Sequence, residues 1–264
     1  MDARVVSPPC LALAGVGKTF AQDGGQTEAL GSIDLSVREG EFLAIVGPSG
    51  CGKSTLLQIA AGLTPATRGS VRFHGEAVTA PPPGIVYLFQ QYGKSLFPWR
   101  TVLDNVAFAV EHRPGMRRAA ARHSSRHYLD MVGLADFADH YPAQLSGGMQ
   151  QRVTIARALA AQPRVLLMDE PFSSVDALTR LELHAIVQDL WQKHGFTAVL
   201  VTHDVDEAVF LADRVAVLSS RPARVVQVLE TGLPRPRDRL DTPQMPRFLE
   251  LRHALLAALL GRRA

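Results

Sequence analysis

The glycine-rich stretch at residues 47–55 constrains the fold more than any other part of this 264-residue sequence. It reads Gly-Pro-Ser-Gly-Cys-Gly-Lys-Ser-Thr and lies between the apolar residues 42–46 and a second apolar segment at 56–61. This order predicts a strand, a tight turn and a helix. Glycines let successive backbone N–H groups converge on an anion, and the following helix adds the positive end of its dipole. The stretch therefore predicts a phosphate-binding loop.

The polar residues of this loop have defined chemical roles in such a site. Lys53 supplies a mobile cation for the β- and γ-phosphates of a nucleotide, and the Ser54 hydroxyl is suited to ligate Mg²⁺. An ordinary glycine-rich turn is the alternative, but the chain has only four lysines, so a chance match at this position is rare. We expect nucleotide binding by Gly47, Pro48, Ser49, Gly50, Cys51, Gly52, Lys53, Ser54 and Thr55.

Composition limits the classes of protein to be considered. The chain is 47% apolar and 20% charged, as expected for a globular protein with a full core. Its net charge of +3 is too small to indicate nucleic-acid binding by itself. No apolar run reaches the ~18–20 residues of a membrane span. No basic region precedes the mildly apolar residues 5–16, so we expect no signal peptide. Cys10 and Cys51 lie far apart, so we expect no structural disulfide and a reducing cytoplasm.

Two further apolar runs end in polar residues that are candidates for chemistry. Residues 165–168 predict a buried strand that ends in Asp169 and Glu170, and residues 197–202 predict another that ends in His203. Parallel sheets place their ligands at the carboxyl ends of the strands. We expect Asp169 to hold Mg²⁺, directly or through water, and Glu170 to lie near the attacked phosphate. Solvated loop acids and a structural histidine are the alternatives.

The remaining segments give a coarse outline of the fold. Residues 102–161 have a helical pattern, and their arginines at 117–126 fit a solvated helix face better than a nucleic-acid patch, because no aromatic residues interleave with them. Residues 233–237 predict a basic linker, and residues 248–260 an amphipathic helix packed on the domain. A helix at 177–194 is predicted with an apolar stripe of Leu178, Leu181, Leu183, Ile186, Val187 and Leu190.

A second glycine-containing turn, Leu-Ser-Gly-Gly-Met-Gln-Gln-Arg at residues 145–152, leads into a predicted helix at 151–161. Alone it is a weak signal, because Ser146 is a common helix N-cap. Its position between the phosphate loop and the strand that ends in Asp169 matches the signature motif of ATP-binding cassette (ABC) transporters. The sequence resembles the ATP-binding subunits of that family over nearly its whole length.

Other segments match the family's motifs in the required order. Gln90 matches the Q-loop glutamine, residues 173–176 match the D-loop with its Asp176, and residues 201–204 match the segment of the switch histidine. Phe20 matches the aromatic residue that stacks on adenine, whereas by its sequence context alone it is equally compatible with a core position.

Residues 96–102, 168–172 and 176–180 resemble, more narrowly, importers of the nitrate/sulfonate/taurine group. Two departures stand out. Five residues, 91–95, separate Gln90 from the Leu-Phe-Pro-Trp segment at 96–99, where about three are expected. Gln90 and Gln91 are therefore both candidates for the functional glutamine. The D-loop has Ser-Val where Ala-Leu is usual.

The resemblance implies an α/β fold. It would be a P-loop NTPase of the ABC type with a mostly parallel core sheet, an N-terminal antiparallel β part and an inserted α-helical subdomain. The implied parts are the N-terminal part of the ATPase core with the phosphate loop, the helical subdomain with the signature motif, the C-terminal part of the core, and a basic linker with a C-terminal helix. They span residues 1–91, 92–161, 162–230 and 231–264.

The resemblance also implies how the site works. A head-to-tail homodimer would close on two ATP molecules, so that each copy contributes its signature residues to the ATP of the other. Glu170 would polarise the attacking water, His203 would hold the γ-phosphate and water in line, and Gln90 would sense the γ-phosphate and Mg²⁺. The implied catalytic residues are Lys53, Gln90, Glu170 and His203, the signature residues are Ser146, Gly147, Gly148 and Gln150, and the Mg²⁺ ligands are Ser54, Gln90 and Asp169.

The implied partners are a second cassette, transmembrane permease subunits and, indirectly, a solute-binding protein, at the cytoplasmic side of the inner membrane. No nucleic-acid partner is expected. Residues 96–99 would meet the permease, with Trp99 as a plain core anchor as the alternative. The competing classes are a non-transport cassette ATPase that acts on DNA or ribosomes, an exporter, and a regulator without hydrolysis. The solute cannot be read from a subunit that never touches it.

Overall fold

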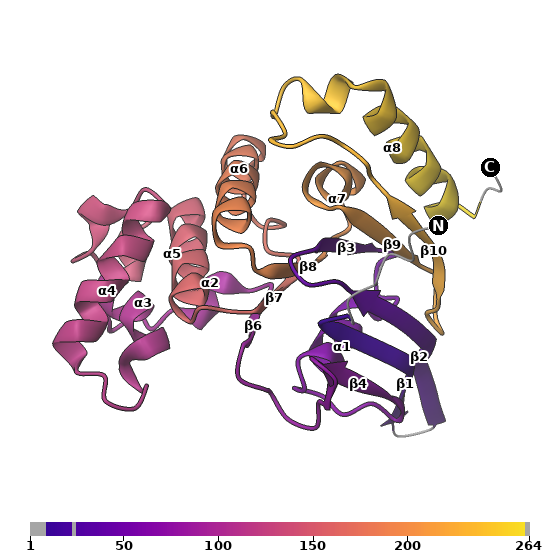
Figure 1. Ribbon diagram of the computed structural model, residues 1–264, viewed down its shortest axis with the longest axis horizontal. Coiled ribbons are helices and arrows are strands. Elements are labelled where there is room, and N and C mark those ends of the chain that lie inside the picture. The colour runs from indigo at the N-terminus through magenta and orange to yellow at the C-terminus, as the bar shows by residue number, and fades with distance from the viewer. Residues whose placement is uncertain (1–8, 23–24, 262–264) are drawn as a thin grey trace, which may run out of the picture. The chain divides into compact units, whose positions relative to one another are not determined.

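The computed structural model describes residues 9–22 and 25–261 of the chain. Residues 5–8 of the mildly apolar N-terminal stretch lie outside this part. The chain divides into two compact units: unit 1 comprises Met1–Pro83 with Phe196–Ala264, and unit 2 comprises Gly84–Gly195. Figure 1 shows the elements of both units. The predicted boundaries at residues 91, 161 and 230 follow motifs rather than packing, and they stay a prediction.

Unit 1 contains an antiparallel sheet and a set of mostly parallel strands. The antiparallel sheet has the order β2-β1-β4-β5, with β1 at Leu11–Gln22, β2 at Gly25–Val37, β4 at Arg68–Phe73 and β5 at Glu76–Ala77. The other strands follow the order β10-β9-β3-β8, with β3 at Phe42–Val46, β8 at Thr197–Val201, β9 at Arg214–Leu218 and β10 at Val225–Glu230. β3 pairs in parallel with β8 and β9, whereas β9 and β10 form an antiparallel hairpin. The predicted β part and parallel core strands are confirmed.

The central strand β3 leads to the first helix of unit 1. Each of its five residues is buried, as expected for an apolar strand between two parallel neighbours. Helix α1 (Lys53–Ala60) follows after the glycine-rich turn. Helices α7 (Val205–Leu211) and α8 (Pro246–Leu259) pack on one another (Figure 1), and α8 also contacts β9 and β10. The predicted packing of the C-terminal helix is confirmed.

The segment predicted as a basic linker, residues 233–237, is part of unit 1 and is partly buried in it. Leu233 is buried, and Arg237 is only 5% exposed. The Arg237 guanidinium donates to backbone carbonyls at the end of α7. The sequence shows the arginines but not these acceptors, which belong to another segment of the chain.

Unit 2 combines a parallel strand pair with helices. Strands β6 (Ile85–Leu88) and β7 (Val165–Asp169) are parallel. Helices α3, α4 and α5 pack on one another, which confirms the predicted helical region. The helices of the unit are α2 (Tyr92–Ser95), α3 (Val102–Glu111), α4 (Arg118–Met131), α5 (Gly147–Ala160) and α6 (Ala177–His194), with 3-10 turns at Ala135–Phe137 and Pro142–Gln144. Within the described ranges, no helix is long and apolar enough to cross a membrane.

Helix α6 has the predicted bounds but not the predicted buried face. Leu178 is 75% exposed and Leu181 is 39% exposed, so the predicted stripe is wrong for these two residues. Two polar side chains are buried in their place, since the buried residues are Leu183, His184, Val187, Gln188 and Leu190. The His184 ring packs edge-on against Phe172, with 4.9 Å between the ring centroids. The apolar residues of α6 are spread around most of its circumference, so their periodicity alone does not identify the packed face.

The arginines at 117–126 are mostly exposed, as predicted, with one exception. Arg117, Arg118 and Arg126 are exposed, whereas Arg122 is half-buried and forms an ion pair with the buried Asp104 of α3. The Thr101 hydroxyl donates to the other carboxylate oxygen of Asp104 at 3.1 Å. Burial opposes the charged form of Asp104, but the hydrogen bond and charge of Arg122, with help from Thr101 and Arg118, outweigh burial and lower the pKa.

We predict that Asp104→Asn lowers the free energy of unfolding by about 2 kcal/mol at pH 7, because it removes the buried carboxylate and leaves Arg122 only the exposed Asp139, at 3.7 Å. A carboxylate with a lowered pKa stabilises the fold above the pKa of the unfolded chain, and this contribution is lost as pH falls through the folded pKa. The variant should therefore lose less stability than wild type between pH 7 and pH 3, measured by urea unfolding. Asp136→Asn, at an exposed aspartate, is the control for loss of a carboxylate that is not buried. Equal pH dependence of wild type and Asp104→Asn would contradict the prediction.

Candidate functional site

The phosphate loop connects β3 to α1 through a turn that requires glycine. Gly50 and Gly52 have φ angles of 70° and 117°, which side-chain-bearing residues rarely adopt. A Cβ on Gly52 would also lie 2.8 Å from Leu30 Cδ2. The Cys51 N–H donates to the Pro48 carbonyl at 3.2 Å and closes the turn. The backbone path therefore fits the predicted loop.

The side chain of Lys53 is already held over this loop. Lys53 is the first residue of α1, and it is only 5% exposed. Its ammonium donates to the carbonyls of Gly47 at 2.9 Å and Pro48 at 3.1 Å. Ser54 and Thr55 follow in the first turn and are half-buried. The cation, the helix N-terminus and the loop backbone thus lie together, and all three favour an anion.

Two further predicted site residues belong to unit 1. Phe20 lies on β1 and is 38% exposed, which removes the alternative of a core position. The Lys18 ammonium lies 5.0 Å from its ring centroid. His203 is exposed and lies two residues after the end of β8, with the buried Thr202 between them. The next residue, Asp204, is the N-cap of α7 and accepts from the N–H groups of Asp206 and Glu207.

In unit 2, Asp169 is the last residue of β7 and is buried. The Tyr87 hydroxyl of β6 donates to its carboxylate at 2.8 Å. This contact fixes the orientation of the carboxylate, as hydrogen bonds to metal ligands commonly do. The sequence analysis missed Tyr87. The available signal was a tyrosine within a short apolar strand, because a buried tyrosine hydroxyl usually finds a partner.

Glu170 and Gln90 meet directly. The Gln90 amide donates to the Glu170 carboxylate at 3.1 Å, which favours Gln90 over Gln91 as the functional glutamine. Glu170 has a φ of 44°, and its carbonyl accepts from the Ser173 hydroxyl at 2.9 Å. Non-glycine residues in this backbone region are strained and occur often at functional sites. Four of the five residues between Gln90 and Leu96 form the short helix α2, which Gln91 precedes.

The signature residues form the N-terminus of α5. The helix begins at Gly147 rather than at residue 151, and the Ser146 side chain caps it by accepting from the Met149 N–H at 3.3 Å. Ser146 and Gly147 are exposed. The Gln150 amide donates to the carbonyls of Pro142 at 3.0 Å and Leu145 at 3.3 Å, so it fixes the turn that precedes the helix.

Helix α6, which follows the D-loop, packs against the signature residue Gly148 through Thr179. Asp176 caps α6, and the Thr179 hydroxyl donates to it at 2.6 Å. This hydrogen bond and those from backbone N–H groups lower the pKa of Asp176. A Cβ on Gly148 would lie 2.4 Å from Thr179 Cγ2. The absence of a side chain at Gly148 therefore permits the close approach of α5 and α6.

The predicted Mg²⁺ ligands offer a hydroxyl, a carboxylate and an amide oxygen, from Ser54, Asp169 and Gln90. This donor set fits Mg²⁺, which prefers oxygen and is usually held by only one or two carboxylates. A larger cluster is not required, and the described part of the chain contains no group of three or more His, Cys, Asp or Glu residues placed to hold a metal.

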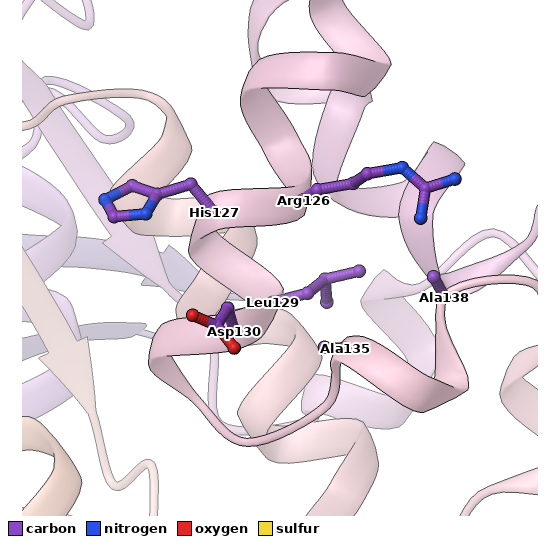
Figure 2. Close-up of a pocket in the computed structure, with 6 residues that line it drawn as sticks. All are labelled: Arg126, His127, Leu129, Asp130, Ala135 and Ala138. Carbon is purple, nitrogen blue, oxygen red and sulfur yellow. The ribbon is translucent and has the colours of Figure 1, made fainter.

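Unit 2 also contains a hollow of about 310 Å³, and its lining includes none of the motif residues (Figure 2). Leu129 and the Arg126 side chain extend toward it, whereas His127 points away. Exposed residues of α4 and the following 3-10 turn form its wall, together with the buried Leu129 and Ala138. It lacks the convergent polar groups of a ligand site.

The family model for the ABC transporter matches residues 30–173, more than half of the chain. The chain belongs to the ABC transporter family. It is an ATP-binding cassette, and cassettes of this family hydrolyse ATP. The predicted family, fold class and enzyme class are therefore confirmed.

Individual relatives narrow the resemblance. The chain is 44% identical to the nitrate import ATP-binding protein NrtD of Synechococcus elongatus, over 90% of this chain and 86% of NrtD. It is 47% identical to the nitrate import ATP-binding protein NrtC of the same organism, over 88% of this chain but only 35% of NrtC. It thus spans about a third of the length of that relative. The predicted resemblance to nitrate-type importers is confirmed.

Solved structures agree with the fold. The dimeric post-hydrolysis structure of the ATP-binding cassette MJ0796, bound to ADP and Pi, has a TM-score of 0.73 and 34% identity, over 83% of this chain and 98% of that one. The cbiO1 structure from Clostridium perfringens, part of the ABC transporter complex cbiONQ, has a TM-score of 0.75 and 26% identity, over 85% of this chain and 89% of that one.

We predict that Gly148→Ala lowers the thermal stability and the ATPase rate, because the new methyl group overlaps Thr179 Cγ2. The double variant Gly148→Ala/Thr179→Ser should recover much of both losses, because serine removes Cγ2 and keeps the hydroxyl that donates to Asp176. Thr179→Ser alone is the control. Strictly additive effects in this double-mutant cycle would contradict the packing.

Proposed function

We propose that this cassette forms a head-to-tail dimer, hydrolyses ATP and drives solute import through separate permease subunits. It would act peripherally at the cytoplasmic side of the inner membrane, with a solute-binding protein as an indirect partner. The observation that carries the proposal is the exposed Trp99, which lies in the segment implied to meet the permease. Trp99 is 72% exposed and is thus not a core anchor.

The surroundings of Trp99 suit a docking role. Phe97 lies beside it, with 5.5 Å between the ring centroids, while Leu96 is buried and anchors the segment. The Arg100 guanidinium lies over Phe97 and Phe108, at 5.4 and 5.1 Å from their centroids. A large exposed aromatic residue on a fixed support is typical of an interface anchor.

We propose the dimer because the chain has two candidate anion-binding elements, the phosphate loop in unit 1 and the signature residues in unit 2. Each consists of glycines at the N-terminus of a helix, α1 for the phosphate loop and α5 for the signature residues. The solved dimer of the cassette MJ0796 supports this assembly. In the closed dimer, Ser146 and Gly148 of one copy would bind the γ-phosphate held by Lys53 of the other. Only the closed state makes these contacts, so ATP shifts the equilibrium toward it.

Within each site, the chain's residues act mainly by positioning, as phosphoryl transfer requires. Lys53 and the loop N–H groups hold the phosphates, and Phe20 stacks on the adenine. Glu170 orients and polarises the attacking water, and His203 holds the water and the γ-phosphate in line. Ser54, Asp169 and Gln90 would hold Mg²⁺. The bound ion would neutralise part of the phosphate charge.

The solute class is proposed from the relatives. Two of them are named nitrate import proteins, and another, CmpC of Synechococcus elongatus, is named a bicarbonate transport protein at 45% identity. We assign this chain to the import of nitrate, a sulfonate, taurine or a related small anion. A binding assay over these anions with the solute-binding protein encoded nearby tests the class.

We predict that Glu170→Gln retains ATP binding, accumulates as a dimer with ATP and loses at least about 100-fold in turnover, because an amide cannot accept the proton from water. Nucleotide binding, size-exclusion chromatography and steady-state hydrolysis measure these three properties. Glu39→Gln, at an exposed glutamate of unit 1, is the control. Normal hydrolysis by Glu170→Gln would refute the role of Glu170.

We predict that Trp99→Ala leaves the ATPase rate of the isolated cassette within about twofold of wild type but weakens permease binding at least about 30-fold. Co-purification and titration with permease subunits of a nitrate-type importer provide the measurement. Tyr141→Ala, at another exposed aromatic residue of unit 2, should bind normally. Unchanged permease affinity in Trp99→Ala would rule out the docking role.

A further inference from the structure

The short helix after His203 is held at its C-terminal end by two arginines of the C-terminal segment. Arg237 donates to the carbonyls of Val209 at 3.2 Å, Phe210 at 2.8 Å and Ala212 at 2.9 Å. Arg235 donates to the carbonyl of Leu211 at 2.7 Å. The last carbonyls of a helix have no partner within the helix, and here four successive ones receive a guanidinium donor.

The N-terminal end of the same helix is also contacted by the C-terminal segment. Arg252 of α8 forms an ion pair with Asp206 in the first turn of α7, at 3.0 Å. Asp204 caps this turn, and His203 precedes Asp204 in the chain. Helix α7 has only seven residues, and helices this short are not stable by themselves. Its position, and that of His203, therefore depends on these external contacts.

Through Asp213, Arg235 is also connected to β3, the strand that leads into the phosphate loop. Asp213 accepts from Arg235 at 2.8 Å through one carboxylate oxygen, and from the Phe42 N–H at 3.0 Å through the other. Phe42 is the first residue of β3, which leads into the phosphate loop. One carboxylate thus links Arg235 of the C-terminal segment to the first residue of β3.

Arg237 is suited to this role by its burial and its shape. Burial lowers its pKa to about 10, with a further lowering by Arg235 that Asp213 opposes, so it remains charged at neutral pH. Its planar guanidinium serves several carbonyls at once, which an ammonium or an amide cannot do in the same geometry. The buried charge is accommodated by these carbonyls and by the Thr231 hydroxyl at 3.2 Å.

We infer that Arg235, Arg237 and Arg252 are positioning residues for ATP hydrolysis, which clamp α7 at both ends and thereby fix His203. The inference rests on the proposed role of His203. It predicts that the C-terminal segment, which none of the nucleotide motifs includes, controls the rate of hydrolysis rather than the affinity for ATP.

The clamp itself is tested without any ATPase assay, by hydrogen–deuterium exchange of the backbone N–H groups of α7. Arg237→Gln should accelerate exchange at residues 205–212 by about tenfold or more, because a charged hydrogen-bond donor is lost from a buried helix end. Arg252→Gln should accelerate it a few-fold, because that pair is half-exposed. The matched control is Arg247→Gln, since Arg247 donates to the carbonyls of Glu230 and Thr231 instead of α7.

The positioning role is tested by kinetics of the full chain. Arg237→Gln should lower kcat about tenfold and leave KM for ATP within about twofold, while Arg247→Gln matches wild type. His203→Ala/Arg237→Gln should be no slower than His203→Ala alone, because a displaced histidine and an absent one are equivalent. If Arg237→Gln does not fold, Arg252→Gln gives the same comparison at a half-exposed position.

The outcomes separate the inference from the proposed function. Unchanged exchange of α7 in both variants would overturn the clamp. Positioning through His203 would be overturned by either of two results. One is faster exchange of α7 with a normal kcat in Arg237→Gln. The other is a kcat of His203→Ala/Arg237→Gln that falls by the product of the two single-variant reductions. A wild-type chain without ATPase activity, or a fully active His203→Ala, would refute the proposed function itself, and exchange would still decide the clamp.

Discussion

A phosphate loop stabilises an anion only if its N–H groups are already oriented when the anion arrives, and this preorganisation is the constraint on which the rest of the structure depends. The loop meets it by following β3, a fully buried strand held between two parallel neighbours. Lys53 is held by the loop's own carbonyls, and Gly52 leaves no room for a side chain. The sheet, the glycines and the lysine thus act together on one turn of backbone.

In the other motifs, the backbone is preorganised at the N-terminal ends of helices. Ser146, Asp176 and Asp204 are the N-caps of α5, α6 and α7, so three motifs of the family each begin a helix in this chain. Each capping side chain fixes the backbone near a residue with a proposed chemical role. A substitution at these positions therefore changes helix geometry as well as chemistry, and variants that keep the cap are the informative ones.

The sequence predicted most of the elements because their signals are local. The apolar run at 42–46 and the helix at Ala177–His194 were predicted with the bounds that the structure has. The motif spacing identified the family and the candidate site residues, two of which, Gln90 and Glu170, contact each other in the structure. In these cases, neighbouring residues along the chain carry the information.

The failures concern contacts between distant segments. Periodicity placed Leu178 in a packed face, whereas it is exposed and His184 is buried against Phe172. The basic residues at 233–237 resembled a linker because their acceptors lie at the end of α7, more than twenty residues earlier. Tyr87 was overlooked because its partner Asp169 lies on a strand 82 residues away. Each of these facts depends on tertiary packing that no local pattern encodes.

The central claim is that each ATP site is completed by a second copy of the chain, and mixed dimers test it most directly. Lys53→Ala disables the phosphate loop, and Ser146→Asp keeps a good helix cap but places a negative charge at the signature site. Each variant alone should be inactive. A mixture of the two should regain ATPase activity, because one site of the mixed dimer combines an intact loop with an intact signature. A mixture that stays inactive, although mixed dimers form, would contradict the account.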